Sequence, residues 1–167
     1  MRICIEELGS KVWKYFDLPV SQSDLDKWIE DELNDIYKEN KLGGIPEEFE
    51  VVDTEDIPFL GSFTSYQTYN KYFELLENED EVLVEYAIEN LGFSAEELVK
   101  DSSCLEDLTK ITSNIEDYVD SIIEEGVLGE IPSNLVNYID TAKFGRDLLI
   151  GGDVTEFSHK NTDYIIY

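Results

Sequence analysis

Positive charge is scarce in this chain of 167 residues. Twelve Lys and Arg stand against 39 Asp and Glu, which gives a formal net charge of −27. A folded polyanion repels DNA, RNA and anionic lipid, and the surfaces that attract it are basic. The composition therefore excludes direct binding to nucleic acid or membrane, and it indicates a basic protein as partner.

Histidine and cysteine are also few. The single histidine, His159, lies in a polar stretch that predicts a solvent-exposed loop. Cys4 and Cys104 are too isolated for a disulfide framework or a zinc site, so we expect small buried side chains in a reducing compartment. Phosphate-binding loops, nucleophile elbows and calcium loops have no match in the sequence. We expect no metal, no cofactor and no enzymatic activity.

Long apolar runs are missing as well. No segment reaches the length of a membrane span, and the N-terminus MRICIEEL lacks the basic and apolar regions of a signal peptide. These absences predict a cytoplasmic protein.

Carboxylates, in contrast, are abundant and evenly spread. Residues 1–61, 62–110 and 111–167 have net charges of −10, −9 and −8. Because 42% of the residues are apolar and 12% are aromatic, we expect a folded acidic protein and not a disordered tail. Solubility, salt adaptation and mimicry of nucleic acid are all compatible with this charge, which matches that of about 46 Å of duplex DNA.

Apolar periodicity predicts strands and one helix in the first third of the chain. Residues 2–8 and 12–18 alternate as a hairpin, and residues 49–53 form a third strand. A helix between them begins at Ser23, with Asp26 completing a capping box. Its apolar face consists of Leu25, Ile29, Leu33 and Ile36.

The middle third is expected to be helical, over residues 66–77, 81–90 and 96–100. Capping boxes are expected at Ser94 with Glu97 and at Ser103 with Glu106.

The last third is expected to contain both helices and strands. A helix capped by Ser113 with Glu116 ends at Gly126, and a shorter helix covers residues 133–140. Strands are expected over residues 146–150, 154–157 and 163–167. The fold class is therefore α+β, in three small domains over residues 1–61 (mixed α and β), 62–109 (helical) and 110–167 (mixed α and β).

One segment, GEIPSNLVNYIDTAKFGRDL at residues 129–148, is more specific than composition. Its pattern predicts a turn, a short helix and the start of a strand, with a left-handed turn at Gly145 and a salt bridge for Arg146. This segment resembles the antirestriction motif of the ArdA family of DNA-mimic proteins, which mobile elements carry. The matching positions are Gly129, Glu130, Pro132, Leu135, Asn137, Tyr138, Ile139, Asp140, Gly145, Arg146, Asp147 and Leu148.

Shorter stretches extend the resemblance. Residues 3–9 are similar to the family's opening strand and turn, residues 56–59 to the end of its first unit, and residues 165–167 to its terminal strand. The stretch between Gly9 and Pro19 is shorter than the corresponding stretch of the family, and the middle third is similar to the family mainly in its acidity.

The resemblance implies an elongated, curved homodimer with three domains per subunit and an acidic surface throughout. It implies that surface carboxylates imitate the phosphates of bent DNA and that the dimer occupies the DNA-binding groove of type I restriction–modification enzymes. In the family, the motif belongs to the C-terminal domain and is linked to dimerisation and antirestriction.

Helical periodicity selects the carboxylates expected to face outward and to stand in for phosphates. They are Asp24, Glu30, Asp31, Asp35, Glu74, Glu77, Glu81, Glu85, Asp117, Asp120 and Glu124. Two alternatives stay open at this point. One is an acidic binding module for another basic protein, such as a nucleoid protein, a repressor or a CRISPR effector. The other is a hydrolase that uses a carboxylate pair, which cannot be selected among 39 candidates.

Overall fold

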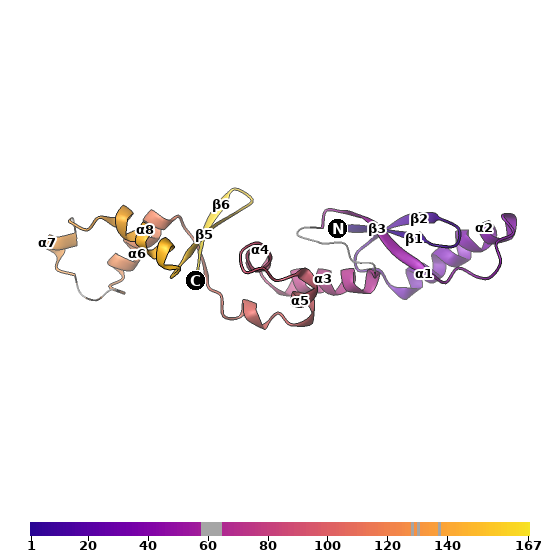
Figure 1. Cartoon of the computed structure of the whole chain (residues 1–167), viewed down its shortest axis with the longest axis horizontal. Helices are drawn as coiled ribbons and strands as arrows, with labels where there is room; N and C mark the ends of the chain where they lie inside the picture. Colours follow the sequence, from indigo (N-terminus) through magenta and orange to yellow (C-terminus); the bar gives the residue numbers. More distant parts are fainter. Residues whose placement is uncertain (58–64, 128, 130, 137) are drawn as a thin grey trace. The chain divides into compact units, whose positions relative to one another are not determined.

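A computed structural model of the chain describes residues 1–57, 65–127, 129, 131–136 and 138–167 (Figure 1). It divides into two compact units, Met1–Ser102 and Ser103–Tyr167. Each unit combines helices with a three-stranded antiparallel sheet, which confirms a mixed α and β fold. The finer division at residues 61/62 and 109/110 stays a prediction.

The sheet of the first unit consists of β1 (Arg2–Glu7), β2 (Val12–Asp17) and β3 (Phe49–Glu55). Their order is β2-β1-β3, and both pairings are antiparallel. The predicted hairpin and third strand are thus confirmed. A bulge in the β1–β3 pairing lies between Cys4 and Ile5.

One face of this sheet is covered by a continuous helical segment. It comprises α1 (Gln22–Trp28), a π-helical turn (Ile29–Leu33) and α2 (Asn34–Glu39). Trp28 is 1% exposed, and its ring contacts the rings of Phe16 and Phe49 at centroid distances of 5.5 and 5.9 Å. This cluster joins the helical segment to both outer strands.

Two details of the predicted helix were wrong. The N-cap is Ser21, whose capping box includes Asp24, and not Ser23 with Asp26. Trp28 and Tyr37 are buried where Ile29 and Ile36 were expected, and those two are only half-buried. The π-helical turn at Ile29–Leu33 accounts for the second change, because its wider turn shifts the face that Ile36 and Tyr37 present.

The rest of the first unit contains α3 (Tyr66–Asn78), α4 (Glu81–Glu89) and α5 (Ala95–Lys100), as predicted. Tyr72 and Val84 are fully buried among them. The capping box of Ser94 with Glu97 is confirmed, whereas Ser103 begins only a 3-10 turn (Ser103–Leu105). Asn70 of α3 ties these helices to the sheet region, because its amide exchanges two hydrogen bonds with the backbone of Val20, at 2.8 and 2.7 Å.

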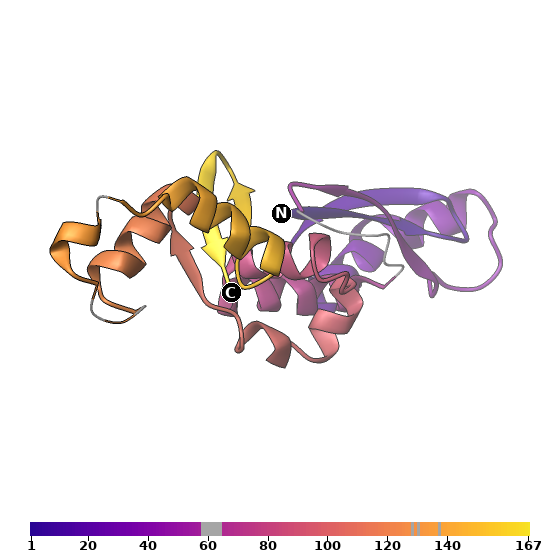
Figure 2. The ribbon, with the colours of Figure 1, turned by 60° about the vertical axis from the view of Figure 1, so that its left-hand side comes forward.

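The sheet of the second unit consists of β4 (Lys110–Thr112), β5 (Thr155–His159) and β6 (Thr162–Ile166), in the order β4-β6-β5. Its helices are α6 (Ile115–Glu124), α7 (Ser133–Val136) and α8 (Thr141–Gly151). In Figures 1 and 2, α6 and α8 lie side by side. The cap of α6 is Asn114, which accepts from the Asp117 amide, and not the expected Ser113 with Glu116.

His159 is the last residue of β5 and is only 7% exposed, so the prediction of an exposed loop was wrong. The two-residue turn is formed by Lys160 and Asn161, both at positive φ, which is typical of tight hairpins. His159 lies two residues after the buried Phe157, so strand alternation places both side chains on the same, buried face of the second sheet.

Candidate protein-binding surface

The first half of the motif is an exposed segment with little regular structure. Gly129 has a φ of +92°, which favours glycine, and the short α7 follows Pro132. Leu135 is 50% exposed and Tyr138 is 85% exposed. The motif residues Glu130 and Asn137 lie outside the described residues. This half of the motif therefore leaves large apolar side chains at the surface.

The second half of the motif forms α8, so the strand predicted at residues 146–150 was wrong. Asp140 caps this helix by accepting a hydrogen bond from the Lys143 amide at 2.9 Å, and Gly152 ends it in the left-handed conformation. The run of apolar residues at 148–150 fits a strand or a helix equally well, and the two caps decide for the helix.

Gly145 has a different role from the predicted left-handed turn. It is buried inside α8, where a Cβ atom would come within 2.9 Å of Ile115 Cγ1 and 3.4 Å of Val119 Cγ2. Both neighbours belong to α6. Gly145 is thus the point at which α8 approaches α6 too closely for any larger residue.

The remaining motif residues lie at or near the surface of α8 and its start. Arg146 pairs with its neighbour Asp147 at 3.6 Å, and both side chains are more than half exposed. Such an exposed pair contributes little to stability. Ile139 and Leu148 are half-buried. The motif therefore combines a structural element, the α6–α8 contact, with an exposed apolar surface.

The predicted phosphate mimics lie mainly at the surface. Nine of the eleven are exposed, on the helical segment 22–39 and on α3 and α6, whereas Glu81 and Glu85 of α4 are half-buried. Burial, together with the charges of these two carboxylates, raises the pKa of the Tyr72 hydroxyl above its usual value. Glu81 and Glu85 thus also act on the interior of the first unit.

Some of the exposed carboxylates have local partners. Asp24 accepts hydrogen bonds from the amide and hydroxyl of Ser21, at 2.8 and 2.5 Å, and these bonds lower its pKa. Asp35 pairs with Lys38, and Asp117 accepts from the Asn114 amide group. The side chains of the other six exposed candidates have no hydrogen bond or ion pair within the described part of the chain. They are Glu30, Asp31, Glu74, Glu77, Asp120 and Glu124.

One carboxylate with a structural role was missed by sequence reasoning. Glu7 is 1% exposed and accepts hydrogen bonds from the Gly9 amide, the Ser10 amide and hydroxyl, and the Tyr37 hydroxyl, at 2.6–3.0 Å. Burial raises the pKa of Glu7, but the hydrogen bonds outweigh burial and the net shift is downward. Glu7 therefore fixes the β1–β2 turn and attaches α2 to it.

The described residues contain neither a metal-binding cluster nor a membrane-spanning helix. No group of three His, Cys, Asp or Glu side chains in these ranges could hold a metal ion. None of the helices there is both long and apolar enough to cross a bilayer.

Sequence comparison defines the class of this protein. Residues 7–162 match the family described as antirestriction protein (ArdA), which includes nearly the whole chain and all of the motif. The chain belongs to the ArdA family and is an antirestriction protein, and membership implies a restriction enzyme as its protein target. No curated protein matches the chain significantly.

Proposed function

We propose that this protein is a DNA mimic that occupies the DNA-binding groove of type I restriction–modification enzymes. The observation that carries the proposal is the set of exposed carboxylates on helices of both units, most of which pair with no Lys or Arg of the described residues. Family membership supplies the antirestriction role, and the arrangement of charge supports this mechanism.

Both units contribute to the charge. Met1–Ser102 has 26 acids and 8 bases, and Ser103–Tyr167 has 13 acids and 4 bases. The ion pairs of Arg2, Lys11, Lys14 and Lys38 all lie in the first unit, and each uses one of its few cations. Most carboxylates of either unit therefore have no cation of their own to neutralise them.

A groove that binds DNA presents Lys and Arg to phosphates, and DNA binding there releases counterions from the duplex. Carboxylates on the mimic attract the same side chains without offering a backbone that can be cut or a base that can be methylated. Binding of the protein is then competitive with DNA and weakens as salt increases, because both ligands use the same charges. No cofactor is needed for this inhibition.

We further propose that the protein is a homodimer that uses the exposed apolar part of the motif. Leu135, Val136 and Tyr138 are 50%, 37% and 85% exposed and lie within four residues of one another. Exposed apolar patches of this kind commonly mark protein–protein interfaces. A dimer would double the acidic surface available to one DNA-binding groove.

The direct test uses purified protein and a purified type I enzyme with its DNA substrate. DNA cleavage and DNA methylation are both measured as the protein is added up to and beyond equimolar amounts. We expect both reactions to stop near stoichiometry and inhibition to weaken when DNA or salt is raised. Undiminished methylation at large excess would contradict the proposal, and it would instead favour an acidic module that binds another basic protein.

A further inference from the structure

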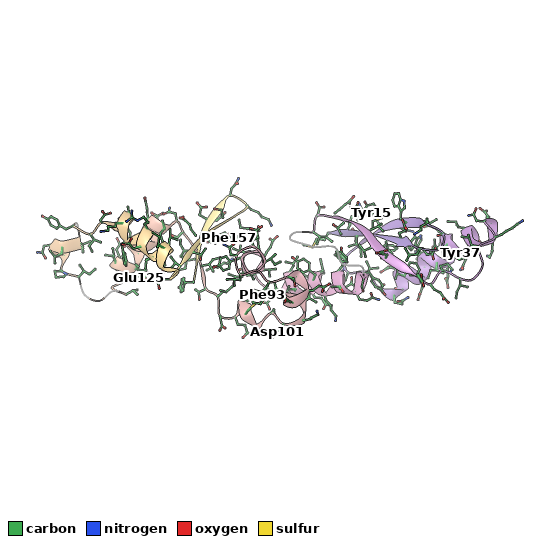
Figure 3. All side chains as sticks on the ribbon, in the orientation of Figure 1. Tyr15, Tyr37, Phe93, Asp101, Glu125 and Phe157 are labelled. Carbon is green, nitrogen blue, oxygen red and sulfur yellow. The ribbon has the colours of Figure 1, made fainter. Side chains whose placement is uncertain are left out.

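The sheet of the first unit has one face that no described helix covers. Glu7 of β1 accepts a hydrogen bond from Tyr37 of α2, and Phe16 of β2 contacts Trp28 of α1. These side chains define the helix-covered face. Residues one position away on each strand point to the opposite side. We call this opposite side the open face. Tyr15, labelled in Figure 3, lies on it, away from α1.

Strand register brings two aromatic rings together on the open face. Trp13 lies opposite Glu6, and Tyr15 lies opposite Cys4. The Trp13 and Tyr15 rings meet edge to face with centroids 6.0 Å apart. Tyr15 reaches across β1 to donate a hydrogen bond to Asp53 of β3 at 2.5 Å. This bond holds Tyr15 in place, and Trp13 rests against a fixed neighbour.

Tyr15 already binds a cation from its own chain. The guanidinium carbon of Arg2 lies 4.9 Å from the centre of the Tyr15 ring, and Arg2 also pairs with Glu55 at 2.9 Å and with Asp17 at 3.7 Å. A ring and two carboxylates thus surround one guanidinium. On this face, an aromatic ring together with carboxylates therefore binds an arginine side chain.

Trp13 offers the same kind of environment, and no Lys or Arg of the described residues lies over its ring. It is 59% exposed, and the neighbouring carboxylate Glu6 is followed across the sheet by Glu50. Lys11 pairs with Glu6 at 3.0 Å. The open face thus has two cations, Arg2 and Lys11, and five carboxylates, which are Glu6, Asp17, Glu50, Asp53 and Glu55. Tryptophan is the side chain with the strongest attraction for a cation above its ring. Charge and aromatic chemistry both favour a basic ligand here.

We propose that Trp13 anchors an Arg or Lys side chain of the restriction enzyme's DNA-binding groove by a cation–π contact. The proposal rests on the proposed DNA mimicry and adds a discrete contact to it. Carboxylates attract the groove at long range, and each contributes a little. A desolvated tryptophan acts only at contact distance and is typical of the few residues that dominate protein interfaces.

The first experiment measures affinity for a type I enzyme by competition with labelled DNA, at several salt concentrations. Trp13→Ala should weaken binding about tenfold, and Trp13→Phe by less, because phenylalanine keeps a ring with a weaker attraction for cations. Neither substitution removes a charge, so the slope of log Kd against log salt should stay that of the wild type. Ile45→Ala is the matched control, since Ile45 is 65% exposed in the same unit but lies outside the sheet.

The outcomes separate the two proposals. If the wild type competes with DNA and Trp13→Ala binds as tightly as the wild type, the anchor is wrong and mimicry stands. If the wild type does not compete at all, mimicry itself is wrong. Sedimentation of Trp13→Ala as a smaller species than the wild type would also overturn the anchor, because the open face would then join two copies of the chain.

A second measurement does not depend on any substitution in this face. The chain has two tryptophans, and Trp28 is 1% exposed. In protein labelled with 5-fluorotryptophan, target binding should shift the fluorine resonance of Trp13 and leave that of Trp28 in place. Trp28→Phe identifies the two resonances. A complex in which the Trp13 resonance does not move would contradict the anchor.

Discussion

The two units of this protein are built on the same plan and differ in what they leave at the surface. Each has a three-stranded antiparallel sheet packed with helices, and each is strongly acidic. Among the described residues of Met1–Ser102 the exposed large apolar side chains, such as Ile45 and Leu91, are scattered along the chain. In Ser103–Tyr167 three of them gather in the motif, between residues 135 and 138. Charge is shared between the units, whereas the clustered apolar surface lies, within the described ranges, in the second unit.

The units also differ in how they fix their helices to the rest of the fold. The first unit uses a buried charge, Glu7, which accepts hydrogen bonds from the β1–β2 turn and from Tyr37 of α2. The second uses the absence of a side chain, since Gly145 lets α8 approach α6. Among the described carboxylates, Glu7 is the one that is buried, so an acidic side chain also stabilises the fold.

Removal of the Glu7 carboxylate should have the largest effect on stability. Glu7→Ala leaves the Tyr37 hydroxyl and the amides of Gly9 and Ser10 without their acceptor, at a cost of about 3 kcal/mol in the free energy of unfolding. Urea denaturation of the full chain measures this loss. Glu47→Ala is the matched control, because it removes the same charge from an exposed position. Equal stability of the two variants would contradict the structural role of Glu7.

Acid should reduce the advantage of Glu7 over glutamine. The folded-state pKa of Glu7 is lowered, so its ionised form stabilises the fold. That stabilisation is complete above the unfolded-state pKa of about 4.3 and is lost as pH falls through the lower folded-state pKa. The stability gap between wild type and Glu7→Gln should thus be widest near pH 7 and close below about pH 4. A gap that does not change with pH would contradict this role of the charge.

Enlarging Gly145 should destabilise the second unit by the next largest amount. In Gly145→Val the new side chain overlaps Ile115 and Val119, and forcing α8 away from α6 costs about 2 kcal/mol. Gly43→Ala serves as the control, because a Cβ at Gly43 meets no atom within 4 Å. Thermal unfolding followed by circular dichroism compares the variants. If Gly145→Val unfolds at the wild-type temperature, the close approach of the two helices is wrong.

Sequence reasoning succeeded where a pattern is local and failed where a contact is distant. Alternation predicted β1 and β2, apolar spacing predicted α3 to α5, and the order of motif residues predicted the family. The caps were displaced by one or two residues, because several Ser, Asn and Asp side chains near each helix start can serve. Such errors leave the element itself unchanged.

The distant contacts explain the larger errors. Gly145 has the sequence signature of a turn, and only the packing of α6 against it shows a helix contact. Strand alternation puts Glu7 in phase with Ile3 and Ile5, but its hydrogen-bond partner Tyr37 lies thirty residues away, and no local pattern predicts that contact. For His159 a usable signal existed, because period-two spacing from Phe157 would have placed it on the covered face.

The exposed apolar surface of the motif gives a further prediction, on self-association. Tyr138→Asp places a charge in the proposed dimer contact, and a second copy brings the same charge to the symmetric interface. We expect self-association to weaken at least tenfold, because an unpaired charge must then be desolvated. Analytical ultracentrifugation measures the change, with Ile150→Asp as control at a site that is 77% exposed outside the motif. A wild type that sediments as a monomer would remove the dimer from the proposal.

The smallest single effect is expected for one exposed carboxylate, and its size tests the contrast between the acidic surface and the discrete anchor. Asp120→Asn removes one charge of 39 without touching a described partner, so inhibition of a type I enzyme should weaken about twofold or less. Neutralising Glu30, Asp31, Glu74, Glu77, Asp120 and Glu124 together should weaken it progressively and should flatten the salt dependence, since fewer charges release fewer counterions. Complete loss of inhibition from Asp120→Asn alone would instead indicate a single essential carboxylate, which is the behaviour of a catalytic site and not of a mimic.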